Sequence, residues 1–408
     1  KEKNKLELKK YWDFEFKNIE DKSNDYYVDG LYENLKLAIK RTFSEKEDFC
    51  VPISGGLDSR RIAGLLEGHK NIITVTYGHK HCYDVVFGRQ IAKVAGFENI
   101  FLELPEDFMS RYAREGVWLT DGDISVHNFH SFVNRDFLKN SGRIMLSGDF
   151  GGTLMGVAVR EEYFKEKFRE EDFINFLLQK KYSFVFNDNE LRYYLQPSIY
   201  DQIKGMQYNF VKQIIKRCPS DHFGNKAHYI SLTQGLPRWL YHVVDIPGSV
   251  TLARRPFADN DFVDFCLSLP LNFRLETEAN QEMIRKYFPR LSKIPTSKTG
   301  FPLDKPWFYE RVYWRVNRLK NRIIPKLTSG LIKFHKREDY AHYDDWLRNN
   351  SSKYFIKRAL KNDIYDVFFK RNLLEGLLTK HFCRKTNEYH KITALLTFGL
   401  WAEIFNYG

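Results

Sequence analysis

The sequence has few cysteines and no long apolar run. Its five cysteines are odd in number, lie far apart and form no Cys-x-x-Cys pair. This spacing excludes a disulfide scaffold and a zinc ribbon, and it suits reduced thiols. No apolar stretch approaches the roughly 18 residues of a membrane-spanning helix, and residues 1–5 lack the apolar core of a signal peptide. We therefore expect a cytoplasmic globular protein without a membrane span.

The composition is that of a globular chain with an excess of positive charge. Of 408 residues, 43% are hydrophobic and 16% aromatic, enough for one large core or two ordinary ones. The net charge of +12 attracts anions, whether nucleotides, acidic glycans, nucleic acid or a lipid surface. The net charge alone does not indicate which of these partners the protein binds.

The most informative stretch runs from Phe49 to Arg60. A short apolar run breaks into Ser54-Gly55-Gly56, and a helical apolar pattern begins at once, which predicts a strand, a tight turn and a helix. Glycines and the free amides of a starting helix form an anion site that suits phosphate. Asp58 in the first helical turn offers an oxygen ligand for magnesium. The turn lacks the lysine of an ordinary P-loop, which disfavours kinase-like transfer of a terminal phosphate.

A repeating strand–helix pattern surrounds this turn. Residues 31–43 have helical spacing, residues 72–78 and 100–104 read as strands, and a helix is predicted from about 83 to 95. Such repeats form parallel sheets, and ligands lie beyond the carboxyl ends of the strands.

Two further motifs carry candidate chemistry. A strand from Arg143 leads into Ser147-Gly148-Asp149, which repeats the strand-to-glycine design, and Lys298 precedes Thr299-Gly300-Phe301. A lysine on a glycine-flanked loop can offset negative charge that develops on phosphates, although a surface lysine is the simpler interpretation of Lys298 taken alone.

Together these motifs resemble the ATP pyrophosphatase superfamily and, within it, the synthetase half of asparagine synthetases. The resemblance implies an α/β fold with a parallel-sheet, adenine nucleotide α-hydrolase-like (PP-loop) domain and a mostly helical C-terminal lobe. It implies ATP and Mg²⁺ as cofactors, Asp58 as a magnesium ligand, and Lys298 and Asp149 as catalytic residues. The implied ATP-binding residues are Ile53, Ser54, Gly55, Gly56, Asp58, Ser59, Tyr77, Ser147 and Gly148.

The resemblance divides the chain into a linker-like segment (1–30), an ATP pyrophosphatase core (31–160) and a helical lobe (161–408). The implied reaction forms an amide: ATP adenylates a substrate carboxylate, and an amine or ammonia displaces AMP. Glutaminase domains of this family use an N-terminal cysteine, and none precedes Cys50. A separate glutaminase is therefore a candidate partner.

The chain departs from the family at Gly152 and Thr153, where relatives carry two acids. One of those acids binds magnesium and the other helps to recognise free aspartate, so the departure argues against aspartate as the substrate. Asp121, Asp123 and Asp149 are candidates for the missing carboxylate. Arg254 and Asp259 match another family segment, and we interpret them as a buried structural pair rather than as catalytic residues.

Two other functions stay open. Basic residues between 311 and 337, interleaved with apolar ones, allow an amphipathic helix that could bind nucleic acid, so an RNA-modifying enzyme is one alternative that we do not favour. A non-catalytic partner subunit is the other, because of Gly152 and Thr153. The histidines at 79, 81, 127 and 130 are interpreted as loop, surface or packed side chains rather than metal ligands.

Overall fold

A five-stranded parallel sheet forms the centre of the computed structural model, which describes residues 8–17, 22–165, 168–182, 185–275, 278–305 and 340–405, with scattered positions between 309 and 323. The strand order is β3-β2-β1-β4-β5, and every pair is parallel. The strands are β1 (Phe49–Pro52), β2 (Ile72–Gly78), β3 (Glu98–Glu103), β4 (Ile144–Leu146) and β5 (Ala253–Arg254). The α/β class and the first four strands agree with the sequence prediction. Sequence reasoning missed β5, which returns from the segment assigned to the helical lobe.

Helices cover both faces of the sheet. Successive side chains of the central strand point to opposite faces, and both sets are apolar and buried. Phe49 and Val51 pack in a large core with residues of α1 (Asn24–Thr42), α2 (Asp58–Leu65) and α3 (Tyr83–Val94). Cys50, between them, packs in a second cluster, formed with α6 (Phe132–Ser141) and α14 (Tyr241–Gly248).

The first helix begins within the segment interpreted as linker-like. Helix α1 begins at Asn24, seven residues before the predicted start, because the Ser23 hydroxyl caps it by accepting the Tyr26 amide at 3.2 Å. Further upstream, the Trp12 indole donates to Asp264 at 3.0 Å. This segment therefore packs on the body of the protein.

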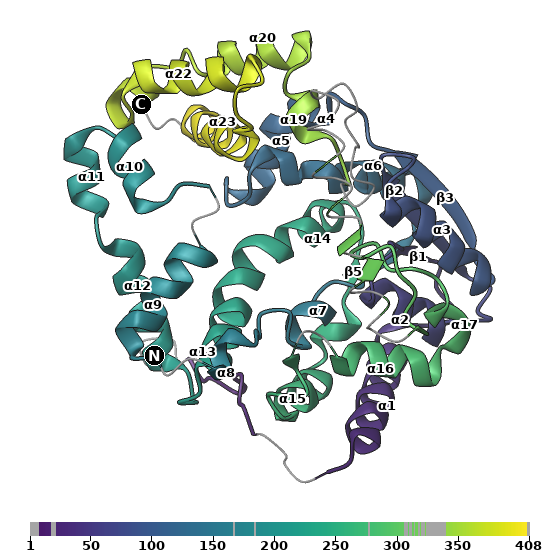
Figure 1. Cartoon of the computed structure of the whole chain (residues 1–408). Coiled ribbons are helices and arrows are strands. Elements are labelled where there is room, and N and C mark those ends of the chain that lie inside the picture. The colour runs from purple at the N-terminus through teal and green to yellow at the C-terminus, as the bar shows by residue number, and fades with distance from the viewer. Residues whose placement is uncertain are drawn as a thin grey trace, which may run out of the picture.

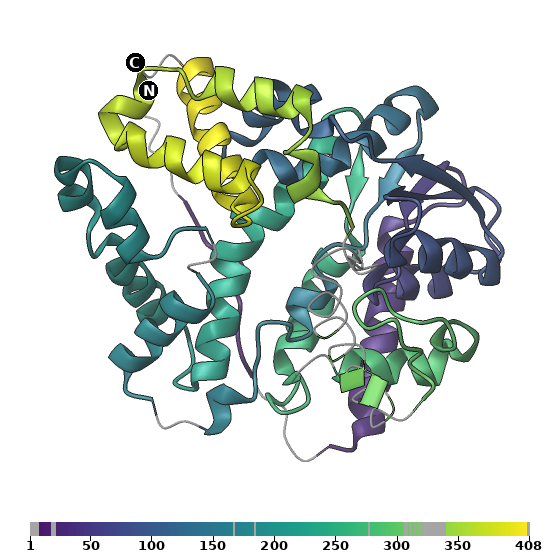
Figure 2. The same ribbon diagram turned by 45° about the horizontal axis from the view of Figure 1, so that its top comes forward.

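The remaining described elements are helical, apart from β5. Figures 1 and 2 show α9, α10, α11 and α12 on the side of the molecule away from the sheet, with α14 between them and the strands. The C-terminal helices gather at one end and share a core with α5 and the 3-10 helix η1.

No helix in the described ranges has the length and apolar character needed to cross a membrane. The bounds are α4 Phe108–Arg111, α5 Ala113–Thr120, η1 Val126–Ser131, α7 Gly151–Leu154, α8 Glu162–Lys165, α9 Glu170–Lys180, α10 Asp188–Tyr194, α11 Pro197–Ile203, α12 Met206–Arg217, α13 Phe223–Ile230, the π-helix η2 Ser231–Leu240, η3 Pro256–Ala258, α15 Asn260–Ser268, α16 Glu278–Tyr287, α17 Pro289–Ser292, α19 Tyr343–Trp346, α20 Asn350–Ala359, α21 Ile364–Phe368, α22 Arg371–Phe382 and α23 Tyr389–Ile404.

Candidate active site

The first glycine turn joins β1 to α2 at the carboxyl end of the central strand. Ser59 closes it: its hydroxyl donates to the Ser54 carbonyl and accepts from the Ser54 amide, both at 3.2 Å. The Ser54 hydroxyl accepts from the Gly56 amide, also at 3.2 Å. The N-cap residue of α2, Leu57, makes no side-chain capping hydrogen bond. The first amides of that helix are therefore available to an anion, which the helix dipole also attracts.

Two contacts hold Asp58, the first residue of α2. One carboxylate oxygen pairs with the Arg61 guanidinium, and the other accepts from the Gly152 amide at 2.7 Å. Arg61 is fully buried, with its guanidinium 4.7 Å from the Phe257 ring centroid. Gly151 leaves room for the pair, because a Cβ there would lie 2.7 Å from a guanidinium nitrogen of Arg61. Asp58 thus ties the first glycine turn to the second.

The second glycine turn follows β4 and carries Asp149. The Ser147 hydroxyl donates to the Asp149 carboxylate. Burial raises the pKa of Asp149 above its ordinary value, the Ser147 hydrogen bond opposes that rise, and the nearby charge of Asp58 adds to it. A carboxyl with a raised pKa is a better proton acceptor than an ordinary surface carboxylate.

Packing from the helical lobe braces this second turn. Phe150 has a φ of +86°, which is strained for a bulky residue, and core burial with a ring contact to Tyr241 at 5.2 Å holds it there. His228 contacts the Thr153 carbonyl through Nε2 at 2.7 Å, and its other ring nitrogen contacts Arg274 at 2.8 Å. The turn therefore has a fixed shape before any ligand binds.

The loop that carries Lys298 is bonded directly to the first glycine turn. The Ser297 amide donates to the Gly55 carbonyl at 3.0 Å. Asp84, at the start of α3, accepts the Gly55 amide at 3.1 Å, and it also accepts a hydrogen bond from the Ser297 side chain. Lys298 follows immediately and is exposed toward the cavity that it lines.

Arg60 also joins the segment before Lys298 to the first glycine turn. Its guanidinium donates to the carbonyls of Leu291 (2.9 Å), Ile294 (2.6 Å) and Pro295 (2.8 Å), and to that of Gly55 at 3.2 Å. The side chain is fully buried. Burial lowers the pKa of Arg60 to about 10, so the group stays charged at neutral pH. One planar fork thus joins four backbone carbonyls, of which Gly55 and Leu291 also accept a backbone amide.

We expect Arg60→Met to destabilise the protein by at least about 3 kcal/mol, because the Ile294 and Pro295 carbonyls lose their charged donor and those of Gly55 and Leu291 lose one of two donors. Turnover should fall as well, since the Lys298 loop loses its anchor. Denaturant unfolding and activity measurements check both effects. Arg290→Met is the matched control: Arg290 lies in α17 and its side chain is 62% exposed, so its loss should change stability by less than about 1 kcal/mol. Equal effects from both variants would contradict the role given to Arg60.

These segments enclose one cavity of about 1520 Å³. It exceeds the roughly 300–1,000 Å³ of most small-molecule sites, so it has room for two substrates. All the residues predicted for the site line it except Gly55, which lies between two lining residues. Those lining it are Ile53, Ser54, Gly56, Asp58, Ser59, Tyr77, Ser147, Gly148, Asp149 and Lys298.

Two of the candidates for the missing carboxylate are wrong. Asp121 accepts the Trp401 indole N–H at 3.0 Å, and Asp123 lies 3.3 Å from His242. Both line a separate hollow against α23 rather than the main cavity. Asp149 alone of the three candidates lines the main cavity, because it follows a strand that ends there.

The predicted pairing of Arg254 with Asp259 is also wrong. Arg254 forms a two-pronged ion pair with Glu47, at 2.6 and 2.8 Å. Asp259 pairs with Arg41 at 2.8 Å and caps the start of α15. Neither residue lines the main cavity: Arg254 lies in β5, whereas Asp259 lies at the start of α15 and has a different partner. Most of the basic segment 311–337 lies outside the described residues.

Sequence reasoning missed several residues of the cavity. Asp84, Asn134 and Tyr340 line it, and His130, interpreted as a surface or packed histidine, lines it too. The sequence does contain a signal for Asp84, because it is an acidic residue at the start of a helix that follows a predicted strand. The others come from segments without a motif. His127 is buried and packed, as one of the interpretations has it.

The donor atoms of the cavity suit a magnesium ion that is shared with phosphates. Mg²⁺ keeps several waters and binds proteins through one or two carboxylates plus phosphate oxygens. Asp58 and Asp149 line the same cavity, and their charges interact. A cation held by Asp58 would offset that repulsion. Within the described part of the chain, no three His, Cys, Asp or Glu side chains form a metal cluster by themselves.

A parallel sheet with glycine turns at the carboxyl ends of β1 and β4 defines an α/β protein whose ligand site lies at that edge of the sheet. The family model for asparagine synthase matches residues 30–311, so the chain belongs to the asparagine synthase family. This membership supports an ATP-dependent ligase. No glutaminase domain is indicated in the chain.

The chain was also compared with curated proteins and with solved structures. A search of curated proteins finds no match to the chain. Among solved structures, the NH3-dependent NAD synthetase from Campylobacter jejuni subsp. jejuni NCTC 11168, in complex with the nitrate ion, is similar at 10% identity and a TM-score of 0.26. The match covers 53% of this chain and 96% of that one.

Proposed function

We propose that the protein forms an amide bond by adenylating a substrate carboxylate with ATP and then passing the acyl group to an amine or to ammonia. The observation that supports this most is the shared cavity: the first glycine turn, Asp149 and Lys298 line it together. Adenylation converts a poor leaving oxygen into a good one. Holding both partners in one cavity makes the second attack effectively intramolecular.

Each group has a defined task in this scheme. The amides of the first glycine turn bind the pyrophosphate part of ATP. The Lys298 ammonium stabilises the negative charge that builds up around the α-phosphate as pyrophosphate leaves. Asp149, with its raised pKa, accepts a proton from the attacking nitrogen.

Asp58 is the residue that would hold magnesium, which leaves the Asp149 carboxylate to accept the proton. The ion, when bound, supplies positive charge to the phosphates. In this chain Arg61 already neutralises part of the charge of Asp58. Arg61 therefore lowers the repulsion between Asp58 and an incoming polyphosphate, whether or not the metal is present.

Free aspartate is not the expected substrate, because Gly152 and Thr153 provide no carboxylate for its ammonium group. Calorimetry with a non-hydrolysable ATP analogue and saturating aspartate should therefore show no heat of binding for aspartate. Ammonia-dependent formation of asparagine at a useful rate would refute this prediction.

A screen of ATP–pyrophosphate exchange tests the proposal. Amino acids, peptides and sugar uronic acids are the candidate carboxylates, and the correct class should give exchange that depends on the added acid. If the protein binds no ATP in the presence of magnesium, the proposal fails and a non-catalytic partner subunit takes its place. Strong, salt-dependent RNA binding without acid-dependent exchange would instead favour the RNA-modifying alternative.

A further inference from the structure

Arg255, the residue after β5, lies beside the second glycine turn. In the sheet, the Ser147 amide donates to the Arg254 carbonyl at 2.9 Å, so the end of β5 runs next to the start of that turn. Ser147 and Asp149 line the cavity, whereas Arg255 is not among the residues that line it. Arg255 is therefore a neighbour of the proposed proton acceptor rather than a part of the cavity wall.

A tyrosine connects Arg255 to the residue that follows Asp149. The Arg255 guanidinium carbon lies 5.0 Å from the centroid of the Tyr241 ring, and the Tyr241 ring lies 5.2 Å from the Phe150 ring. Cation–ring and ring–ring contacts at such distances are attractive. The three side chains thus link β5 to the second glycine turn.

The turn needs this support because its backbone is strained. Phe150 has a φ of +86°, which bulky residues rarely adopt, and a change in this angle would rotate the peptide group that joins it to Asp149. The Asp149 carboxylate would then leave its hydrogen bond with Ser147. A misplacement of about 1 Å is enough to lower a rate by about 10²-fold. Contacts that hold Phe150 therefore also hold Asp149 in place.

An acid on the same helix as Tyr241 fixes Arg255 in turn. The Arg255 guanidinium donates to the Asp245 carboxylate at 2.6 Å, and Asp245 lies about one helical turn after Tyr241 in α14. The ion pair therefore keeps the guanidinium against the ring. The charge of Arg255 also acts on the cavity: burial raises the pKa of Asp149, and Arg255 opposes that rise. It thereby favours the ionised carboxylate, which is the form that accepts a proton.

We propose that Arg255 is a positioning residue for the second chemical step: through Tyr241 and Phe150, it holds Asp149 where the carboxylate accepts a proton from the attacking nitrogen. This inference rests on the proposed function. In that step the nitrogen forms a bond to the acyl carbon, the bond between that carbon and the AMP oxygen breaks, and the proton passes to Asp149. Because Arg255 does not line the cavity, the adenylation step should not depend on it.

Separate assays of the two steps in the full chain test this role. The acid that supports exchange is supplied with ATP and magnesium, and ammonium chloride is the nitrogen donor. Arg255→Met should keep ATP–pyrophosphate exchange within about threefold of wild type and lower the kcat of amide formation by about 10–100-fold, with an unchanged KM for ammonium. The melting temperature should change little, because the Asp245 side chain is 48% exposed and water hydrates it when its partner is removed.

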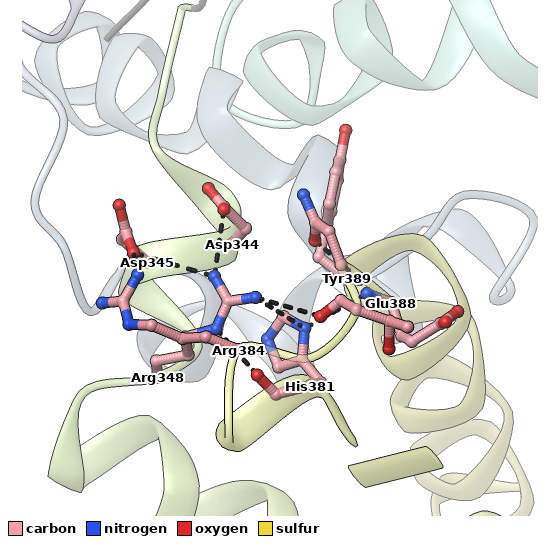
Figure 3. Close-up of polar contacts among 9 residues, drawn as sticks. Asp344, Asp345, Arg348, His381, Arg384, Glu388 and Tyr389 are labelled. Carbon is pink, nitrogen blue, oxygen red and sulfur yellow. Dashed lines mark hydrogen bonds and ion pairs between the residues drawn. The ribbon is translucent and has the colours of Figure 1, made fainter. Parts of the chain in front are cut away.

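Arg384→Met is the matched control. Figure 3 shows Arg384 in a polar cluster with Asp345, to which its guanidinium donates at 2.7 Å, close to the 2.6 Å of the pair formed by Arg255 and Asp245. None of the residues labelled in that cluster lines the cavity. Both steps should therefore keep their wild-type rates in this variant.

Tyr241→Leu gives a second readout of the same connection. It removes the ring that Arg255 and Phe150 contact, so amide formation should fall as far as in Arg255→Met while exchange is retained. The two substitutions combined should cost no more than Tyr241→Leu alone. Losses that multiply would show that the two residues act separately, and equal losses in both steps would assign Arg255 a general structural role. Either result would overturn the inference and leave the proposed function intact, whereas absence of exchange by wild type with every acid would overturn both.

Discussion

Asp58→Asn is expected to abolish turnover and to lower the free energy of unfolding by about 3–5 kcal/mol, the usual cost of leaving a buried charge without its partner. The buried charge is that of Arg61, which is fully enclosed and pairs with Asp58. Two functions of one carboxylate are therefore lost together: the proposed magnesium ligand and the counter-ion that holds Arg61. Denaturant unfolding and pyrophosphate release measure the two losses separately.

The double variant Asp58→Asn with Arg61→Met separates these functions. Removing both charges should restore most of the lost stability, because an apolar side chain replaces the unpaired guanidinium among core residues. Turnover should stay absent if Asp58 acts on the nucleotide. Recovery of turnover in the double variant would show that Asp58 is structural alone. Wild-type pyrophosphate release by the single variant at ordinary magnesium would rule out its role as a ligand.

Lys298→Ala is expected to cut turnover by roughly 10²–10³ while ATP affinity stays within a few fold, the loss typical of one electrostatic stabiliser. The side chain is exposed at the cavity and makes no ion pair among the described residues, so its removal leaves nothing buried unpaired. Its interaction strengthens as charge develops around the α-phosphate, and only such differential contacts raise the chemical rate. Pyrophosphate release and ATP binding, measured side by side, check both parts.

Two further variants sharpen this comparison. Lys298→Arg should rescue turnover poorly, because a planar fork does not replace a compact ammonium. Lys293→Ala is the matched control: Lys293 is exposed, lies five residues earlier in the same segment and does not line the cavity. Equal turnover in wild type and in all three variants would return Lys298 to the solvent-exposed surface and remove it from the mechanism.

The parts of the fold that sequence reasoning found are those with a local signal. Strand β1 and the turn after it follow from an apolar run that stops at Ser54-Gly55-Gly56, and the parallel sheet follows from the strand–helix repeat. Strand β5 was missed because two residues carry no periodicity. Its place in the sheet depends on pairing with β4, more than a hundred residues away in the sequence.

The two arginines after Asp58 show why the rest of the site needed the structure. In a short helix, Arg60 and Arg61 read as a polar, solvent-facing pair, since charged side chains are almost never fully buried unless paired. Both are fully buried here. Three of the four carbonyls that hold Arg60 lie more than 230 residues further along the chain. Partners at such separations leave no trace in local spacing.

The cavity wall beside Tyr77 was missed for the same reason. Asn134 and Tyr340 belong to no motif, and they line the cavity from segments that lie far apart in the sequence. By contrast, Asp149 and Lys298 were predicted because they stand within motifs that resemble those of the family, and the structure brings both to one cavity.

The most direct measurement follows an oxygen atom. Once exchange has identified an acid, its carboxylate is labelled with ¹⁸O, and AMP and pyrophosphate are analysed by mass spectrometry after turnover with the amine. If the carboxylate attacks the α-phosphorus, one labelled oxygen stays on the phosphate of AMP when the amine displaces it, and pyrophosphate carries none. Label in pyrophosphate or in free phosphate, or AMP without label, would contradict adenylation of the carboxylate.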